Sequence, residues 1–169
     1  VLLNQAFHPD VVATAQMAKD LADHLALKGH DVSAIASRSI YGKTGAVLAK
    51  REIITAGQQG STTSPRRGVI TAHRVGFSLF GKKGTLSRLA DFAFFYILAT
   101  WKVLTIRRAD VIIGFSTPPY IALLALVHRF FRGGKAVYWA MDLYPDVPVA
   151  SGMLKETSLL TRLLERLHR

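Results

Sequence analysis

The sequence contains no cysteine among its 169 residues, which excludes structural disulfides and thiolate metal sites. No apolar run reaches the roughly 20 residues that a membrane-spanning helix needs, and the most apolar segment, residues 92–101, is followed directly by Lys102. The first loop, residues 5–14, lacks a Gly-x-Gly-x-x-Gly fingerprint and a Walker-type Gly-Lys-Ser/Thr, which disfavours a standard NAD or ATP site at this turn. Because no spacing of His, Asp and Glu is typical of a metal site, we expect neither a bound metal nor a resident cofactor.

Acidic residues are scarce, with 11 Asp and Glu against 22 Lys and Arg and a net charge of +11. The imbalance is concentrated in residues 38–88, where Glu52 is the only acidic residue. Such a charge favours phosphate-bearing surfaces. The segment is either a solvated basic loop or a contact for an anionic membrane, and it lacks the signatures that would favour nucleic acid. Its ten basic residues are Arg38, Lys43, Lys50, Arg51, Arg66, Arg67, Arg74, Lys82, Lys83 and Arg88.

The two ends of the sequence fall inside regular patterns. The chain begins at Val1 rather than Met, and residues 1–3 already have strand character. Residues 159–167 follow a helical pattern that continues to the end of the chain. We therefore expect both ends to be cut, so that residues 1–169 form one truncated domain.

Strand-like and helix-like patterns alternate along the chain, as in α/β proteins. The apolar runs at 111–115 and 136–140 are continuous, which is typical of strands buried on both faces of a parallel sheet. We expect an α/β fold, a Rossmann-like three-layer domain with a mostly parallel sheet. Residues 38–68 are poorly patterned, and the turn-rich stretch 57–65 predicts a mobile loop. The expected central strands are 1–3, 32–35, 111–115 and 136–139, with a further strand at 69–75 and helices at 14–28, 86–107 and from 120 or 121 to 132.

Two of the expected helices carry more detailed signals. In the first, Met17, Leu21 and Leu25 recur every four residues beside alanines, which predicts a stripe that faces the core. Gly29 is expected to end this helix, because glycine adopts the left-handed conformation without steric cost. In the second, residues 92–101 suit either a buried helix or one that lies partly in a membrane interface. The candidate interface anchors are Phe92, Phe95, Tyr96 and Trp101, with Arg107 and Arg108 near the helix end.

Three loops, 5–14, 116–120 and 142–152, follow strands of the predicted parallel sheet, at the edge where such sheets bind ligands. Asp142 follows an apolar strand and either accepts a proton from a hydroxyl or closes an Asx-type turn. The helix start near 13–16 either holds a phosphate with unpaired N–H groups or is capped by side chains. The polar candidates at this edge are His8, Asp10, Asp142 and Asp146, with Asp10 or Thr14 as possible caps, whereas His24, His30 and His128 are expected to be surface, turn or packing residues.

Six segments of the chain, in order and spacing, resemble glycosyltransferase family 4. They are residues 4–16, 21–22, 27–32, 109–113, 117–119 and 141–146. The last, Met141-Asp142-Leu143-Tyr144-Pro145-Asp146, looks like the Asp-Leu-Trp/Tyr-Pro-Glu/Asp stretch of the subgroup that makes bacterial surface polysaccharides. The family often has Gly-Gly where this chain has Val12-Ala13, so two Cβ atoms replace the glycines that let the loop approach the donor's phosphates.

The resemblance implies the N-terminal, acceptor-side half of a GT-B fold, whose active site lies between two Rossmann-like domains. It implies a retaining, metal-independent transfer from a nucleotide-sugar to a glycan acceptor that is lipid-linked. The donor would bind mainly to a second domain outside these residues, so we expect the chain alone to be inactive. We expect the whole enzyme to be cytoplasmic and peripheral on the inner face of the membrane, without a nucleic-acid partner.

The resemblance also implies roles for individual residues. Asp142 would be the catalytic residue. The residues that the resemblance implies in substrate binding are Gln5, His8, Asp10, Ala13, Thr14, Thr117, Pro118, Tyr144 and Asp146.

The alternative function is a non-catalytic, basic Rossmann-like module that docks on a membrane surface or a protein partner.

Overall fold

A six-stranded sheet in the order β3-β4-β2-β1-β5-β6 organises the described part of the chain. The computed structural model describes residues 1–41, 43, 46–56, 67–77, 85–107, 109–142, 146–150 and 162. The strands are β1 (Leu2–Leu3), β2 (Val32–Ser37), β3 (Arg51–Ile54), β4 (Ile70–Val75), β5 (Val111–Gly114) and β6 (Lys135–Tyr138). The helices are α1 (Ala13–Leu27), α2 (Thr85–Thr105), α3 (Leu123–Arg132) and α4 (Asp146–Ala150).

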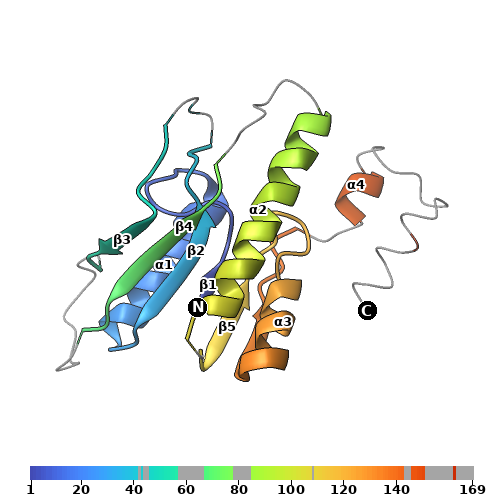
Figure 1. The fold of residues 1–169 in the computed structure, drawn as a ribbon. Coiled ribbons are helices and arrows are strands. Elements are labelled where there is room, and N and C mark those ends of the chain that lie inside the picture. The colour runs from blue at the N-terminus through green and yellow to red at the C-terminus, as the bar shows by residue number, and fades with distance from the viewer. Residues whose placement is uncertain are drawn as a thin grey trace.

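The sheet is mostly parallel, as predicted. Within the described residues, β1 pairs in parallel with both β2 and β5, and the pairs β2–β4 and β5–β6 are also parallel. The antiparallel pair is β3 with β4. β1 therefore lies at the centre of the sheet, between the half that the chain forms first and the half that it forms after α2 (Figure 1).

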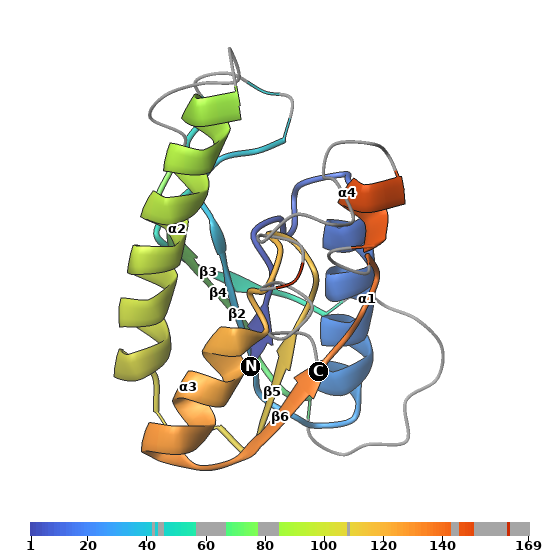
Figure 2. The same cartoon turned by 90° about the vertical axis from the view of Figure 1, so that its right-hand side faces the viewer.

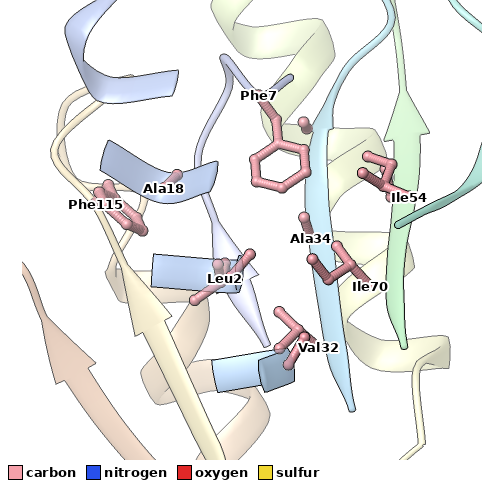
Figure 3. Close-up of a cluster of buried hydrophobic side chains, with 12 residues drawn as sticks. Leu2, Phe7, Ala18, Val32, Ala34, Ile54, Ile70 and Phe115 are labelled. Carbon is pink, nitrogen blue, oxygen red and sulfur yellow. The ribbon is translucent and has the colours of Figure 1, made fainter. Parts of the chain in front are cut away.

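Helices cover both faces of the sheet, which makes three layers. α1 lies on one face, and α2 and α3 lie side by side on the other (Figure 2). Neighbouring residues of one strand enter different cores, because side chains alternate between the faces of a sheet. Leu2 joins the cluster beneath α1, which Figure 3 shows, whereas Leu3 joins the cluster beneath α2 and α3. The two-residue strand β1 thus contributes to both cores.

The buried face of α1 consists mainly of small side chains. Ala18, Ala22 and Ala26, spaced four residues apart, are fully buried. Met17 is 42% exposed, so the predicted stripe is wrong at that position: the core face falls on the alanines one residue further along, with Leu21 and Leu25 packed partly against the core. Alanines at this spacing let the helix lie close to the strands. Gly29 has a φ of 90°, which confirms the predicted stop.

The inner face of α2 packs against the sheet and α3. Phe95, Ala99 and Val103 are buried at four-residue spacing. Phe95 therefore cannot anchor the helix in a membrane. The hydroxyl of Tyr96 donates a hydrogen bond to the carbonyl of Pro119, so this side chain also faces inward. Of the predicted anchors, Trp101 is exposed and Phe92 is half-buried.

β6 differs from its prediction as a buried central strand. Among the described residues it is an edge strand, paired only with β5. Val137 and Tyr138 are exposed, in keeping with a strand that has a described neighbour on one side only. β3 was not predicted. Its sequence, Arg51-Glu52-Ile53-Ile54, lacks the alternation of polar and apolar residues that indicates a strand, and its first three residues are exposed. The loop predicted at 57–65 lies outside the described residues, while β5 lies in the sheet interior as expected.

His128 has a packing role, as predicted. Its imidazole is fully buried on α3. Nδ1–H donates to the carbonyl of Val103 at 3.0 Å, and Nε2 accepts from the amide of Ala109 at 3.4 Å. Both ring nitrogens of the neutral form are thereby satisfied, and α3 is fastened to the end of α2. His24 and His30 are exposed.

A first prediction concerns Gly114, the last residue of β5. A Cβ atom at this position would lie 2.5 Å from Cα of Ala122, so Gly114→Ala would push the start of α3 away from the sheet. We expect the free energy of unfolding to fall by about 1–3 kcal/mol, the usual cost of overpacking. Urea denaturation measures this change, and an unchanged midpoint would show that the contact relaxes freely.

A second prediction concerns His73 on β4. Burial, and then the charges of Lys102 and Arg51, lower the pKa of this side chain from 6.5 to about 4. Between these values the unfolded chain binds a proton that the folded chain does not, so stability falls as the pH falls from about 6.5 toward 4. In His73→Gln this contribution should disappear, which makes the fall shallower in denaturation measured at several pH values. His24→Gln, at an exposed position, is the control and should change the slope less than His73→Gln does; equal slopes for all three proteins would contradict the assignment.

Candidate functional site

The loops that follow β1 and β5 lie side by side at one edge of the sheet. β1 and β5 are parallel neighbours, and from β1 the chain proceeds first to β2 on the other side. This is a topological switch point, where open parallel sheets bind ligands beyond the carboxyl ends of their strands. The amide of Gln5 donates to the carbonyl of Thr117 at 2.8 Å, so the two predicted loops are joined directly.

The loop after β6 reaches the same place through Asp142. The hydroxyl of Ser116, which is buried, accepts a hydrogen bond from the amide of Asp142 at 3.1 Å and lies 3.4 Å from its Oδ2. The hydroxyl of Tyr138 donates to the carbonyl of Asp142 at 3.3 Å. Although much of the Tyr138 side chain is exposed, partial desolvation, followed by the negative charge of Asp142, raises its pKa. All three predicted loops therefore meet, the first and second at Gln5 and Thr117, the second and third at Ser116 and Asp142.

The carboxylate of Asp142 is positioned but only partly enclosed. Its side chain is half-buried, and Ser116 restrains both its main chain and its Oδ2. A half-buried carboxylate at this edge is able to accept a hydrogen bond or a proton from a bound hydroxyl. The same hydrogen bonds also close the loop, so the geometry agrees both with a catalytic Asp142 and with one that only closes a turn.

Asp10 holds the first loop in shape. It is buried, with Oδ2 accepting from the amide of Tyr41 at 2.7 Å and Oδ1 from the amide of Val12 at 3.3 Å. Both carboxylate oxygens are thus occupied by main-chain N–H groups. Asp10 therefore ties the loop to the segment after β2.

The buried side chain of Asn4 fastens the same loop to α1. Its Nδ2 donates to the carbonyls of Ala6, at 2.7 Å, and Thr14, at 3.2 Å. Thr14 therefore contributes its main chain to the loop framework. Since Asn4 directly follows β1, a single side chain sets the path from the central strand to the helix start.

Arg74 holds the first loop through a hydrogen bond to its main chain. It lies near the end of β4 with a fully enclosed side chain, Nη2 donating to the carbonyl of His8 at 2.7 Å and Nη1 lying 2.6 Å from Oε2 of Glu52 on β3. Arg74 therefore does not belong to the solvated basic surface in which its sequence position placed it. Its charge is compensated by the only acidic residue of that segment, so the guanidinium is a structural group.

The start of α1 points to the same edge and carries no side-chain cap. Val12 is the N-cap residue, and no side chain caps the helix. Of the two alternatives for this helix start, capping by the side chain of Asp10 or Thr14 is not found: Asp10 accepts a hydrogen bond from the amide of Val12, the residue before the helix. Ala13 is exposed at the first helical position. Helix amides that lack a cap favour anions.

The remaining predicted residues are dispersed. His8 is exposed, and its carbonyl rather than its ring makes the contact with Arg74. Pro118 is buried, whereas Asp146 is exposed at the start of α4. Tyr144 lies outside the described residues. The structure thus brings Gln5, Thr117 and Asp142 into one chain of contacts.

Three residues of this site were missing from the sequence prediction: Asn4, Arg74 and Ser116. Arg74 had a signal, since Ile70, Ala72 and Arg74 share one face of β4 and are all buried; a two-residue period places the arginine in the core. Ser116 is a small polar residue soon after an apolar strand, a position that suits an anchoring hydroxyl. No local pattern marks Asn4 as a double donor.

Comparisons were made with protein-family models, with curated proteins and with solved structures, and none of them matches this chain. Within the described residues, no three His, Cys, Asp or Glu side chains gather as a metal site would require.

A third prediction tests the anchoring role of Ser116. Ser116→Ala removes the acceptor for the amide of Asp142, leaving a partly buried N–H group without its partner. We expect the free energy of unfolding to fall by about 1–3 kcal/mol and the amide of Asp142 to exchange faster with solvent. Ser33→Ala, on β2, is the matched control and should change neither quantity as much. Equal effects of the two substitutions would argue against a special role for Ser116.

Proposed function

We propose that this chain is the acceptor-binding N-terminal domain of a retaining glycosyltransferase with the GT-B architecture. The whole enzyme would transfer a sugar from a nucleotide-sugar to a lipid-linked glycan acceptor. The observation that carries the proposal is the meeting of three loops at the switch point of a mostly parallel sheet, through the contacts Gln5–Thr117 and Ser116–Asp142. These loops contain segments on which the resemblance to glycosyltransferase family 4 rests.

In this proposal Asp142 faces the acceptor hydroxyl or the transferred sugar. Its carboxylate is half-buried and oriented by Ser116, which supports a role in orienting a hydroxyl or accepting its proton. In retaining transfer the reacting groups must be held in a fixed arrangement, and a carboxylate on a restrained loop meets that need.

The start of α1 would lie near the phosphates of the donor. Uncapped amides at a helix N-terminus favour anions, and Ala13 is exposed there. The Val12-Ala13 pair brings Cβ atoms where family members often have glycines, so we expect the phosphates to sit further from this loop and to depend more on the second domain. The isolated chain is accordingly expected to bind free sugar nucleotides weakly and to transfer none.

The enzyme would act as a peripheral protein on the cytoplasmic face of the membrane, where a lipid-linked acceptor is presented. None of the described helices combines the length and the apolar character required to traverse a bilayer. The alternative is a non-catalytic basic module that docks on a membrane or protein partner, which the net charge of +11 favours. Turnover by the full-length protein distinguishes the two.

A fourth prediction tests the role of Asp142 in the full-length enzyme. Asp142→Asn keeps the size of the side chain and one acceptor oxygen but loses charge and basicity. We expect kcat to fall by roughly 10²–10⁴ while the melting temperature stays close to that of the native enzyme, because Asn also closes Asx-type turns.

The matched control is Asp110→Asn, since Asp110 is an exposed aspartate before β5, at the opposite edge of the sheet. It should retain nearly full turnover. Normal turnover of Asp142→Asn would show that Asp142 only closes the loop. A large drop in its melting temperature that accounts for the lost activity would lead to the same conclusion.

A further inference from the structure

The outer face of α2 is apolar along most of its length. In the described part of this helix the exposed positions are four residues apart and uncharged: Leu89, Ala93, Ile97, Trp101 and Thr105. Leu89, Ile97 and Trp101 are 63%, 67% and 70% exposed. A helix that covers a sheet ordinarily turns polar residues to water. Here the five described outward positions carry no charged residue and include three large apolar side chains.

The neighbouring helix α3 extends this surface. Leu126, Phe130 and Phe131 are exposed, Phe130 by 83%, and the rings of Phe130 and Phe131 touch edge to face. α3 is held beside α2, because His128 bonds the carbonyl of Val103 and Arg132 donates to the carbonyl of Leu104 at 2.8 Å. We call the exposed apolar side chains of the two helices, Leu89, Ile97, Trp101, Leu126, Phe130 and Phe131, the α2–α3 face. An apolar surface of this kind on a folded domain marks an interaction site.

Basic residues lie near the ends of α2 and α3, which are at the bottom of the view in Figure 2. Arg107, Arg129, Arg132 and Lys135 are exposed there and Lys102 is half-buried, while Asp110 is the exposed acidic residue of the same stretch. Exposed aromatic and aliphatic side chains beside Lys and Arg are the composition of helices that lie in the interface of an anionic membrane.

The hydroxyl group on the α2 stripe is already hydrogen-bonded within the helix. The hydroxyl of Thr105 donates to the carbonyl of Trp101 at 3.0 Å or of Lys102 at 3.1 Å. A hydroxyl that is bonded in this way costs less to move from water into a headgroup region than a free one. The stripe can therefore enter an apolar environment without leaving its hydroxyl unpaired.

We propose that the α2–α3 face is a docking surface for an anionic lipid bilayer, with Ile97, Trp101 and Phe130 inserted among the lipids and the basic side chains on the headgroups. A second copy of the chain fits less well, because two basic rims would be brought together and repel. The surface differs from the basic segment 38–88 and from the inward-facing Phe95 and Tyr96. This proposal deepens the proposed function by naming the surface through which the enzyme would contact the membrane. It rests on the proposed function for the biological purpose of that contact, and not for the contact itself.

The test measures binding of the full-length protein to vesicles of phosphatidylcholine, with and without phosphatidylglycerol, by co-sedimentation at low salt. We expect tighter partition into the anionic vesicles and a loss of binding as salt is added. Ile97→Ser should reduce the partition coefficient about tenfold, as the loss of one inserted aliphatic side chain predicts. Ile53→Ser is the matched control, because Ile53 on β3 is 68% exposed and lies outside the α2–α3 face; it should change the coefficient less than about twofold.

Trp101 provides a direct signal. The chain has two tryptophans, and Trp139 is stacked on Phe115 at 5.3 Å, so Trp139→Phe leaves Trp101 as the reporter. Its emission should shift to shorter wavelength when anionic vesicles are added. An unshifted emission, equal binding to the two vesicle types, or equal losses in the two isoleucine variants would overturn the proposal. So would a dimer in sedimentation that Ile97→Ser dissolves, since it would assign the face to a second copy. Vesicle binding requires no sugar transfer, so its failure is distinguishable from a failure of the proposed enzyme activity.

Discussion

Parallel pairing of the short strand β1 with both β2 and β5 is the constraint on which the candidate site depends. Because the three strands run in one direction, the loops that follow them emerge at one edge. The chain moves from β1 to β2 and only later returns to β5 on the opposite side, which opens the edge between them to a ligand. The hydrogen bond from Gln5 to Thr117 spans that junction at 2.8 Å, and the function we propose follows from this meeting of distant segments.

The role of a charged side chain in this molecule depends on its surroundings in the fold and not on the sequence segment in which it lies. Arg74 is enclosed beneath the first loop, where it pairs with Glu52 and holds the carbonyl of His8. The carboxylate of Asp10 likewise accepts hydrogen bonds from main-chain amides. Two groups of accessible charge lie where we propose contacts with partners: Asp142 at the sheet edge, and the basic residues beside α2 and α3. The first suits a hydroxyl-bearing acceptor and the second an anionic surface, and both needs arise together if the acceptor is a lipid-linked glycan.

Much of the architecture could be predicted from sequence periodicity. The apolar run of β5, the four-residue spacing of α1 and the stop at Gly29 identify their elements because local side-chain patterns reflect burial. The same patterns fail for β6, since an apolar strand looks alike whether or not a neighbour covers it, and Val137 and Tyr138 are exposed. They also did not separate the inward from the outward side of α2: Phe95 is buried, whereas Ile97, two residues later and about half a turn around the helix, is exposed.

The site itself was only partly predictable. That three loops share one edge follows from a parallel sheet, and Asp142 could be chosen because it follows an apolar strand. Its partner Ser116, 26 positions earlier in the chain, could not, because a hydrogen bond across that separation depends on the relative placement of β5 and β6. The contact of Asp10 with Tyr41 was unpredictable for the same reason, since the two residues are 31 positions apart.

The central claim is that ligands bind at the carboxyl edge of the sheet, over the junction of β1 and β5. Amide shifts in nuclear magnetic resonance spectra test it most directly, while a nucleotide-sugar and a glycan acceptor are added separately to the isotope-labelled protein. Even weak binding moves the signals of nearby amides. The account predicts shifts concentrated at Gln5, Ala13, Ser116 and Asp142. Shifts concentrated instead at the opposite edge, around Gly29, Asp110 and Gly133, would contradict it.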